Sequence, residues 1–379
     1  MIRVLVIAPL GIGGITSMML NIQKRLNPMK IHFDYLVFRN EVEAKEDEIV
    51  KLGSKKYVVD VSMIHSKFIA RITKLKLLKE LCKKNTFDVL YINAEPSYEV
   101  LLAVAAKAGG VKKVIYHSHN ASGTYESKIK TIMHAIFKVI MTRYIDKFIA
   151  CSEKAAHFSF PTKIVKNHEY TILKNGIDAD KFKYNHSVRL EMRKKFEIEE
   201  KYVVGHVGRF STQKNHKFLI DIFFEIHKKD KSAVLLLLGT GELLQEVQKK
   251  IISLNLEDSV IYLGTSDEME KIWQSMDVFL FPSLYEGLPV AGIEAQAAGL
   301  PIVASDSISD ELAITDLVEF VSLNNNAEYW ADKVLKKKAI LRDNQKDKIE
   351  KAGYGIESTV KQITNIIENL FSKTVGKHD

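Results

Sequence analysis

A loop and helix in the second half of the chain carry two glutamates separated by seven residues, Glu286 and Glu294. Pro289 lies between them and suits the first turn of a helix, because its missing N–H would be unpaired there anyway. The backbone N–H groups of residues 287–291 would then point at one spot, where the helix dipole favours an anion. A glutamate beside an anion site is expected to contact hydroxyl groups, as a sugar would provide. The segment therefore indicates a ligand that carries both negative charge and hydroxyls.

Arg209 and Lys214 follow directly after an apolar strand that is expected at residues 202–207. Ligands of parallel α/β sheets bind outside the carboxyl ends of the strands. An arginine there offers a fork of donors to a phosphate, and a lysine offers a mobile point charge. Two solvated loop cations would show the same spacing, so these residues alone leave both interpretations open.

Gly13 and Gly14 belong to a glycine cluster, GIGG, between the first expected strand and the first expected helix. A residue without a Cβ lets the backbone approach a ligand closely, and the helix that follows presents free N–H groups. The cluster is not the six-residue GxGxxG fingerprint, and no acidic residue follows at the ribose-binding distance. A tight strand-to-helix turn explains the cluster equally well.

His117 and His119 stand where another strand ends. A lone histidine in such a place is more often a satisfied loop residue than a catalyst, and which of the two is better placed depends on where the strand stops. Asp178 and Asp180 have the Asp-x-Asp spacing of metal-dependent transferases. However, Asp178 follows an Asn-Gly turn and is expected to cap the short segment Ala-Asp-Lys-Phe. We therefore expect no metal site at this pair.

The elements that must position these residues alternate between short apolar runs and amphipathic helical stretches, a pattern typical of parallel sheets with helices on both faces. The pattern repeats after a charged joint at roughly residues 175–201. It predicts an α/β protein of two Rossmann-like, doubly wound domains that face each other across a cleft, each long enough to bury its own core. Strands are expected at 3–8, 33–38, 89–92, 113–117, 147–151, 202–207, 233–238, 260–263, 278–281 and 301–304, and helices at 17–26, 67–84, 99–108, 128–144, 217–228, 243–254, 268–275 and 290–298.

Composition excludes several classes of protein. The 379 residues are 46% hydrophobic and 27% charged, which is typical of a globular protein. The two cysteines, Cys82 and Cys151, lie far apart and form no CxxC pair, so a disulfide framework or zinc site is not expected. The first residues read as a strand rather than a signal peptide, and no apolar run is long enough to span a membrane. We expect a cytoplasmic protein.

The charge is distributed unevenly along the chain. Residues 1–189 contain 31 Lys and Arg against 17 Asp and Glu, whereas residues 190–379 contain 24 against 30. A basic half suits an anionic membrane, a phosphorylated substrate or a nucleic acid. The lysine-rich helix expected at 67–84 favours peripheral association with the inner face of the cell membrane, with an ordinary solvated helix as the alternative. No aromatic-interleaved basic motif supports a nucleic-acid partner.

The segment EGLPVAGIEAQAAGLPIVAS resembles the E-x7-E signature of the retaining glycosyltransferases of family 4. GIGG, NGID at 175–178 and GRFSTQKN at 208–215 occur in the family's order, so the resemblance covers almost the whole chain. His117-Ser118-His119-Asn120 is similar to a segment of the bacterial capsular and exopolysaccharide members. The resemblance implies the GT-B fold, with an acceptor-binding domain at 1–190, a nucleotide-sugar-binding domain at 191–355 and a C-terminal helix at 356–379 that returns to the N-terminal domain.

The resemblance also implies roles for individual residues. Gly13 and Gly14 would approach the diphosphate of the donor, Arg209 and Lys214 would pair with it, and Glu294 would accept hydrogen bonds from the ribose. Glu286 would hold the hydroxyls of the transferred sugar, and His119 would lie at the reacting centre. The implied catalytic residues are His119, Glu286, Arg209 and Lys214, and the implied donor-binding residues are Gly13, Gly14, Arg209, Lys214, Glu286, Gly287, Leu288, Pro289, Val290 and Glu294.

The expected function is that of a retaining glycosyltransferase. It would move a hexose from a nucleotide diphosphate sugar to a lipid-linked or saccharide acceptor in cell-surface polysaccharide biosynthesis. UDP as the nucleotide follows from the family resemblance, and neither a cofactor nor a metal is expected. The alternatives are an enzyme like the nucleotide-sugar 2-epimerases, which share the architecture, and a non-catalytic protein that binds nucleotides or nucleic acid.

Overall fold

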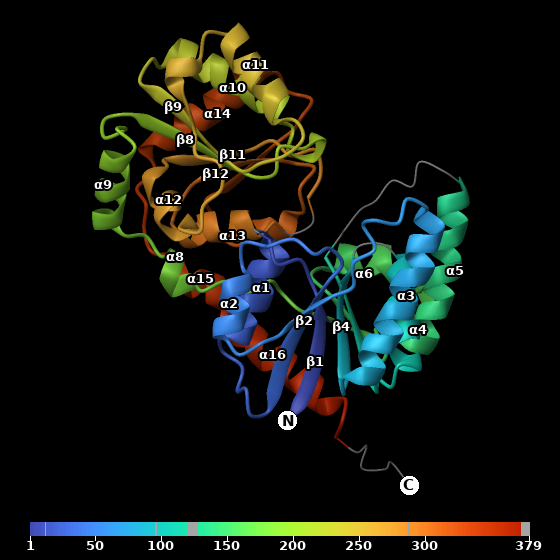
Figure 1. Ribbon diagram of the computed structural model, residues 1–379. Coiled ribbons are helices and arrows are strands. Elements are labelled where there is room, and N and C mark those ends of the chain that lie inside the picture. Colours follow the sequence, from blue (N-terminus) through green and yellow to red (C-terminus); the bar gives the residue numbers. More distant parts are fainter. Residues whose placement is uncertain (12, 95–96, 120–127, 287–288, 373–379) are drawn as a thin grey trace. The chain divides into compact units, whose positions relative to one another are not determined.

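The computed structural model describes residues 1–11, 13–94, 97–119, 128–286 and 289–372. The described chain divides into two compact units, one made of residues 1–176 with the helix after Gly355, the other of Ile177–Gly355 (Figure 1). No helix in the described ranges is long and apolar enough to cross a membrane.

Unit 1 is built on a seven-stranded parallel sheet with the order β3-β2-β1-β4-β5-β6-β7. The order reverses between β1 and β4, which makes their carboxyl ends the switch point where doubly wound sheets bind ligands. The strands are β1 (Ile2–Ile7), β2 (Ile31–Val37), β3 (Lys56–Val58), β4 (Val89–Ala94), β5 (Lys113–Ser118), β6 (Lys147–Ala150) and β7 (Tyr170–Ile172).

Alternate residues of these strands enter two separate cores. On β1, Leu5 and Ile7 face one core, while Val4 and Val6 face the other. The first core is covered by α3 (Lys67–Lys84), α4 (Val100–Ala108), α5 (Lys128–Tyr144) and α6 (Glu153–Ser159). The second is covered by α1 (Gly14–Gln23), α2 (Glu46–Lys51) and α16 (Ile356–Asn369), while α7 (Thr162–Lys166) follows α6. Packing against α1 thus ties α16 to unit 1 despite the intervening half of the chain.

Unit 2 repeats the plan with a six-stranded parallel sheet of order β10-β9-β8-β11-β12-β13. Its switch point lies between β8 and β11. The strands are β8 (Tyr202–Val207), β9 (Ala233–Leu238), β10 (Val260–Tyr262), β11 (Val278–Phe281), β12 (Ile302–Ser305) and β13 (Val318–Val321). The helices are α8 (Ala179–Phe182), α9 (His186–Lys195), α10 (His216–Lys229), α11 (Leu244–Ser253), α12 (Met269–Ser275), α13 (Val290–Ala297), α14 (Ala327–Leu335) and α15 (Lys346–Lys351). Short 3-10 turns occur at Ser97–Glu99, Thr212–Lys214, Glu257–Ser259, Asp310–Leu312 and Lys336–Ala339.

Two doubly wound α/β units were predicted from the sequence, and the structure confirms them. Three strands were not predicted: β3, β7 and β13. All three are short strands at the edges of their sheets and are only partly buried, so they lack the continuous apolar run of a central strand. The stretch at 175–201 is also more than a joint, because α8 and α9 lie in it and pack on α12. The units accordingly divide after Gly176, ahead of the expected residue 190.

Candidate active site

The switch point of unit 2 brings the loop after β8 against the loop after β11. The amide of Asn215 donates to the Pro282 carbonyl at 3.2 Å, and the Leu284 N–H donates to the Gln213 carbonyl at 2.8 Å. Asn215 has the left-handed conformation, with φ 54°, which asparagine tolerates better than most residues. These bonds hold the two loops together at the carboxyl edge of the sheet.

Lys214 and Glu286, both expected at the site, form an ion pair there. The Lys214 Nζ lies 2.7 Å from the Glu286 Oε1, and the two side chains are only 14% and 8% exposed. Gln213 donates to the other carboxylate oxygen at 3.1 Å. The pair is thus largely shielded from solvent, where breaking a pair by removing one partner is far more costly than at the surface. In the unliganded protein, Lys214 therefore already has an anionic partner.

Arg209 is more exposed than Lys214 and has a different ion-pair partner. It is 74% exposed and pairs with Glu242, whose carboxylate lies 3.1 Å away in the loop after β9. The same loop packs tightly under the loop after β8, because a Cβ on Gly239 would meet the Gly208 carbonyl oxygen at 1.9 Å. Gly239 also has φ +134°, which disfavours any other residue. This loop was not predicted as part of the site, although its Gly-Thr-Gly sequence directly after a strand is a usable signal.

Helix α13 begins at Val290, with Pro289 as its N-cap. This corrects the expected position of Pro289 by one residue, from the first turn to the cap. Helix geometry leaves the N–H groups of Val290 and Ala291 without a partner in the helix, and the dipole favours an anion beside them. Two residues expected at the donor site, Gly287 and Leu288, lie outside the described residues.

Glu294 lies one turn into α13 and is held by a residue that the sequence did not single out. The indole Nε1 of Trp273, on α12, donates to the Glu294 Oε2 at 3.1 Å. Burial raises the pKa of the Glu294 carboxyl to about 7, with a smaller contribution from Glu270, while Trp273 lowers it. A carboxylate with such a pKa is a candidate for a functional position.

In unit 1, Gly13 caps α1 with an extended backbone, φ 173°. A Cβ added to Gly13 would have no atom within 4 Å. The fold itself therefore does not require glycine at this position, which weakens the tight-turn explanation. Gly13 and Gly14 are exposed at the carboxyl end of β1, beside the free N–H groups of the helix.

The two candidate histidines differ in burial. His117 is fully buried on β5, and its Nδ1 contacts the Tyr91 hydroxyl at 2.8 Å. His119 follows the strand, is partly exposed, and contacts Asn93. Burial lowers the pKa of His119 to about 4, so the ring is neutral at physiological pH. His119 is the better placed of the two to reach a ligand, while Asn120 lies outside the described residues.

Asp178 caps α8, as the sequence predicted: its carboxylate accepts from the Lys181 N–H at 3.2 Å. Asp180 pairs with Lys346 at 2.5 Å. Both carboxylates thus have partners of their own within unit 2.

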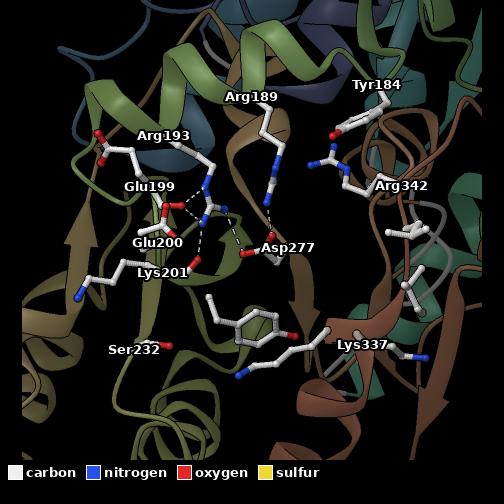
Figure 2. A pocket seen from close by; sticks show the side chains of 14 residues that line it. Tyr184, Arg189, Arg193, Glu199, Glu200, Lys201, Ser232, Asp277, Lys337 and Arg342 are labelled. Carbon is white, nitrogen blue, oxygen red and sulfur yellow. Dashed lines mark hydrogen bonds and ion pairs between the residues drawn. The ribbon is translucent and has the colours of Figure 1, made fainter.

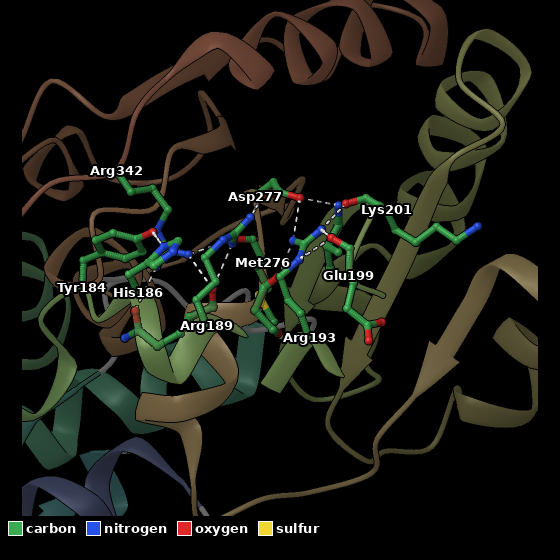
Figure 3. Close-up of polar contacts among 12 residues, drawn as sticks. Tyr184, His186, Arg189, Arg193, Glu199, Lys201, Met276, Asp277 and Arg342 are labelled. Carbon is green, nitrogen blue, oxygen red and sulfur yellow. Dashed lines mark hydrogen bonds and ion pairs between the residues drawn. The ribbon is translucent and has the colours of Figure 1, made fainter. Parts of the chain in front are cut away.

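A cavity of about 510 Å³ in unit 2 lies at the opposite edge of the sheet, beside the residues that precede β8, β9 and β11 (Figure 2). The arginines that line the cavity already bind other groups of the protein. Arg189 and Arg193 bind Asp277 (Figure 3). Arg342 donates to the carbonyls of Trp273, Gln274, Met276 and Ala298. These carbonyls end α12 and α13, where cations stabilise the helix dipole. We infer that this cluster has a structural role and stabilises the ends of α12 and α13.

Two parallel doubly wound units with polar residues at their switch points are typical of α/β proteins that bind ligands at the carboxyl ends of their strands. Residues 12–181 match the sequence model of Glycosyltransferase Family 4, and residues 188–355 match that of Glycosyl transferases group 1. Together the two matches cover most of the chain. The protein belongs to the family 4 glycosyltransferases, so the epimerase-like and non-catalytic alternatives give way to a glycosyltransferase.

Individual proteins agree with this assignment. The chain is 29% identical over 373 residues to a protein of Bacillus subtilis (strain 168) provisionally named glycosyltransferase EpsF, covering 95% of this chain and 94% of that protein. It is 25% identical over 243 residues to the Escherichia coli UDP-Gal:alpha-D-GlcNAc-diphosphoundecaprenol alpha-1,3-galactosyltransferase, covering 60% of each. The crystal structure of Anabaena Alr3699/HepE in complex with UDP and glucose has a similar fold, with a TM-score of 0.79, 17% identity and coverage of 97% of this chain and 100% of that one.

Proposed function

We propose that this glycosyltransferase is a retaining hexosyltransferase that uses a UDP-sugar and extends a lipid-linked saccharide in cell-surface polysaccharide assembly. The observation that carries the donor site is the buried Lys214–Glu286 pair, whose glutamate lies four residues ahead of the start of α13. A UDP donor is supported by HepE, which was crystallised with UDP and glucose. A lipid-linked acceptor is supported by the E. coli relative, whose acceptor is a diphosphoundecaprenol-linked sugar.

In the proposed chemistry, groups that are already in place stabilise the negative charge that develops on the leaving diphosphate. Lys214, Arg209 and the N–H groups of Val290 and Ala291 would meet the phosphates, and Gly13 and Gly14 would admit them from unit 1. Such preorganised donors stabilise a transition state more than a ground state. Glu286 would hold the hydroxyls of the transferred sugar, and Glu294 those of the ribose.

A donor screen tests the function. Purified protein is incubated with UDP- and GDP-sugars and a set of diphosphopolyprenol-linked acceptors, while released nucleoside diphosphate is measured. We expect turnover with a UDP-hexose and a product whose anomeric configuration, read by NMR, is that of the donor. Turnover with GDP-sugars alone, or an inverted product, would contradict the proposal.

Metal-independent turnover is the next prediction. Lys214, Arg209 and the start of α13 supply positive potential for the diphosphate, and Asp178 and Asp180 are engaged elsewhere in unit 2. Turnover should stay within about twofold of the untreated rate in excess EDTA, because the fixed cation and N–H dipoles perform the role of a metal. Loss of activity that Mn²⁺ restores would show that a cation takes part.

Association with an anionic membrane is supported by two helices of unit 1 that flank α4. Figure 1 shows α3 and α5 on either side of α4. On α5, Ile132, Ile136 and Val139 are 61%, 54% and 71% exposed, at a spacing that puts them on one face. On α3, Phe68 is 73% exposed among lysines. Exposed apolar side chains among basic residues match a membrane surface, where each basic residue contributes roughly 1 kcal/mol.

Vesicle sedimentation checks this prediction. Binding to vesicles with anionic lipid should weaken as salt rises. The double variant Ile132→Asn/Ile136→Asn should bind about thirtyfold more weakly, since each apolar side chain contributes on the order of 1 kcal/mol. Leu341→Asn is the matched control, because Leu341 is 91% exposed but lies in unit 2. Equal binding to neutral vesicles, or equal loss in the control, would count against a specific surface on unit 1.

A further inference from the structure

Asn93 connects the switch point of unit 1 to the candidate reacting histidine. It lies on β4, paired in register with His117 of β5. Its Nδ2 donates to the Ile7 carbonyl, on β1, at 3.1 Å, and its Oδ1 lies 3.0 Å from the His119 Nε2. One side chain thus spans from the end of β1 to the residue that follows β5.

Elementary hydrogen-bond chemistry sets the orientation of both side chains. A backbone carbonyl can only accept, so the Asn93 atom that faces Ile7 must be the amide nitrogen. The atom that faces His119 is then the amide oxygen, which can also only accept, so the His119 Nε2 must carry a proton. A neutral imidazole has a single N–H, and the His119 Nδ1 therefore carries a lone pair.

This lone pair has no hydrogen-bond partner among the described residues, and the Nδ1 atom is shielded from solvent. The neighbouring His117 ring does not supply a donor in the right direction. Its centroid lies 4.0 Å away at an interplanar angle of 41°, so the two rings are tilted against each other, and no hydrogen bond joins His117 to the His119 Nδ1. A buried acceptor without a donor is unfavourable by about 1–3 kcal/mol, and such groups in folded proteins call for an explanation.

We propose that Asn93 is a positioning residue that holds His119 in the Nε2–H tautomer, so that Nδ1 accepts a hydrogen bond from a hydroxyl of the bound sugar. A phosphate oxygen has no proton to donate at neutral pH and is not a partner for this atom. The ligand chemistry at this position is therefore that of a neutral polyol, in contrast to the anion site on unit 2. This inference rests on the proposed glycosyl donor as the source of the hydroxyl.

The neutral state of His119 is consistent with its surroundings. Its titratable neighbours are His117, which itself contacts Tyr91, and Cys151, whose thiol contacts the His119 carbonyl. Among the described residues, no charged side chain forms a hydrogen bond or ion pair with the imidazole. Burial alone lowers the pKa of His119 to about 4, so protonation does not compete with the lone pair near neutral pH.

Long-range ¹H–¹⁵N NMR of the full chain labelled with ¹⁵N-histidine reads the tautomer directly, and the spectrum of His119→Ala assigns the signal among the twelve histidines. At pH 7.5 we expect a protonated Nε2 and an unprotonated Nδ1 for His119. UDP-sugar should shift the Nδ1 resonance towards the hydrogen-bonded range, and UDP alone should not. In Asn93→Ala the signal should become an average of both tautomers. A His119 that carries its proton on Nδ1 in the wild type would overturn the proposal.

Kinetics give a second readout. Asn93→Ala should lower kcat by about tenfold, the equivalent of one hydrogen bond of about 1.4 kcal/mol, and leave UDP affinity within twofold. Asn85→Ala is the matched control, because Asn85 also makes two side-chain hydrogen bonds in unit 1, to Leu81 and Tyr57. If the control lost as much kcat, Asn93 would be merely structural. If no UDP-sugar turned over but the tautomer were as expected, the proposed function would fail and the positioning role of Asn93 would stand.

Discussion

Lys214→Met is expected to lower kcat by about 10²–10³, the usual loss when one preorganised electrostatic donor is removed. Lys214 should meet charge that grows as the bond between sugar and phosphate breaks, so the transition state loses more than the ground state. The affinity for free UDP should therefore fall by a smaller factor. Steady-state kinetics and calorimetric titration with UDP measure the two effects.

Two further variants separate catalysis from folding. Lys214→Met alone leaves the nearly buried carboxylate of Glu286 without its cation, which typically destabilises by about 3–5 kcal/mol. The double variant Lys214→Met/Glu286→Gln removes that uncompensated charge, and it should unfold near the wild-type temperature while remaining inactive. Lys217→Met is the matched control, since Lys217 is 65% exposed in its pair with Glu246 and should matter little. Wild-type kcat in the folded double variant would rule out Lys214 as a phosphate contact.

Glu294→Gln is expected to stabilise the protein at alkaline pH and to weaken nucleotide binding. The folded state raises the pKa of this carboxyl from 4.5 to about 7, mainly through burial. Below pH 4.5 the carboxyl is protonated in both folded and unfolded chains, and it then carries no penalty. As pH rises from 4.5 to 7, the folded state must ionise a group that it holds unfavourably, so stability is lost over this window.

Glutamine has no charge to bury, so the stabilisation by Glu294→Gln should be near zero at pH 4.5 and largest above pH 7. The pKa shift corresponds to about 3 kcal/mol, which we reduce to about 1–2 kcal/mol because the side chain is partly exposed. Thermal melts at pH 5 and pH 8.5 measure the difference. Glu246→Gln, at an exposed carboxyl whose pKa Lys217 lowers, should show no such gain.

The affinity for UDP should fall in the Glu294→Gln variant, although its stability rises. An ionised carboxylate accepts hydrogen bonds from both ribose hydroxyls, and a bond to a charged group contributes about 1.5–3 kcal/mol, so Glu294→Gln should bind UDP roughly tenfold more weakly or worse at pH 8. The wild type should itself lose UDP affinity as pH falls through about 7, as Glu294 becomes protonated. A variant that gained stability and kept its UDP affinity would remove Glu294 from the ribose site.

Most of the fold could be predicted from the sequence. Central strands such as β9 and β11 are continuous apolar runs because both of their faces are buried, and the helices between them carry a helical period. The prediction therefore found both doubly wound sheets. It failed at the short edge strands β3, β7 and β13, each of which contains a polar residue, but it found the equally short edge strand β10, whose residues are all apolar.

The sequence by itself determined that Gly13, Arg209, Lys214 and Glu286 stand at the carboxyl ends of strands, whereas the choice between His117 and His119 needed the observed end of β5. It could do so because position along the chain follows from local pattern. Only the tertiary structure decided their partners. The pairs Lys214–Glu286, Trp273–Glu294 and Asn93–His119 join residues 72, 21 and 26 positions apart. Side-chain contacts across neighbouring strands and helices depend on sheet order and packing, and no local period in the sequence encodes them.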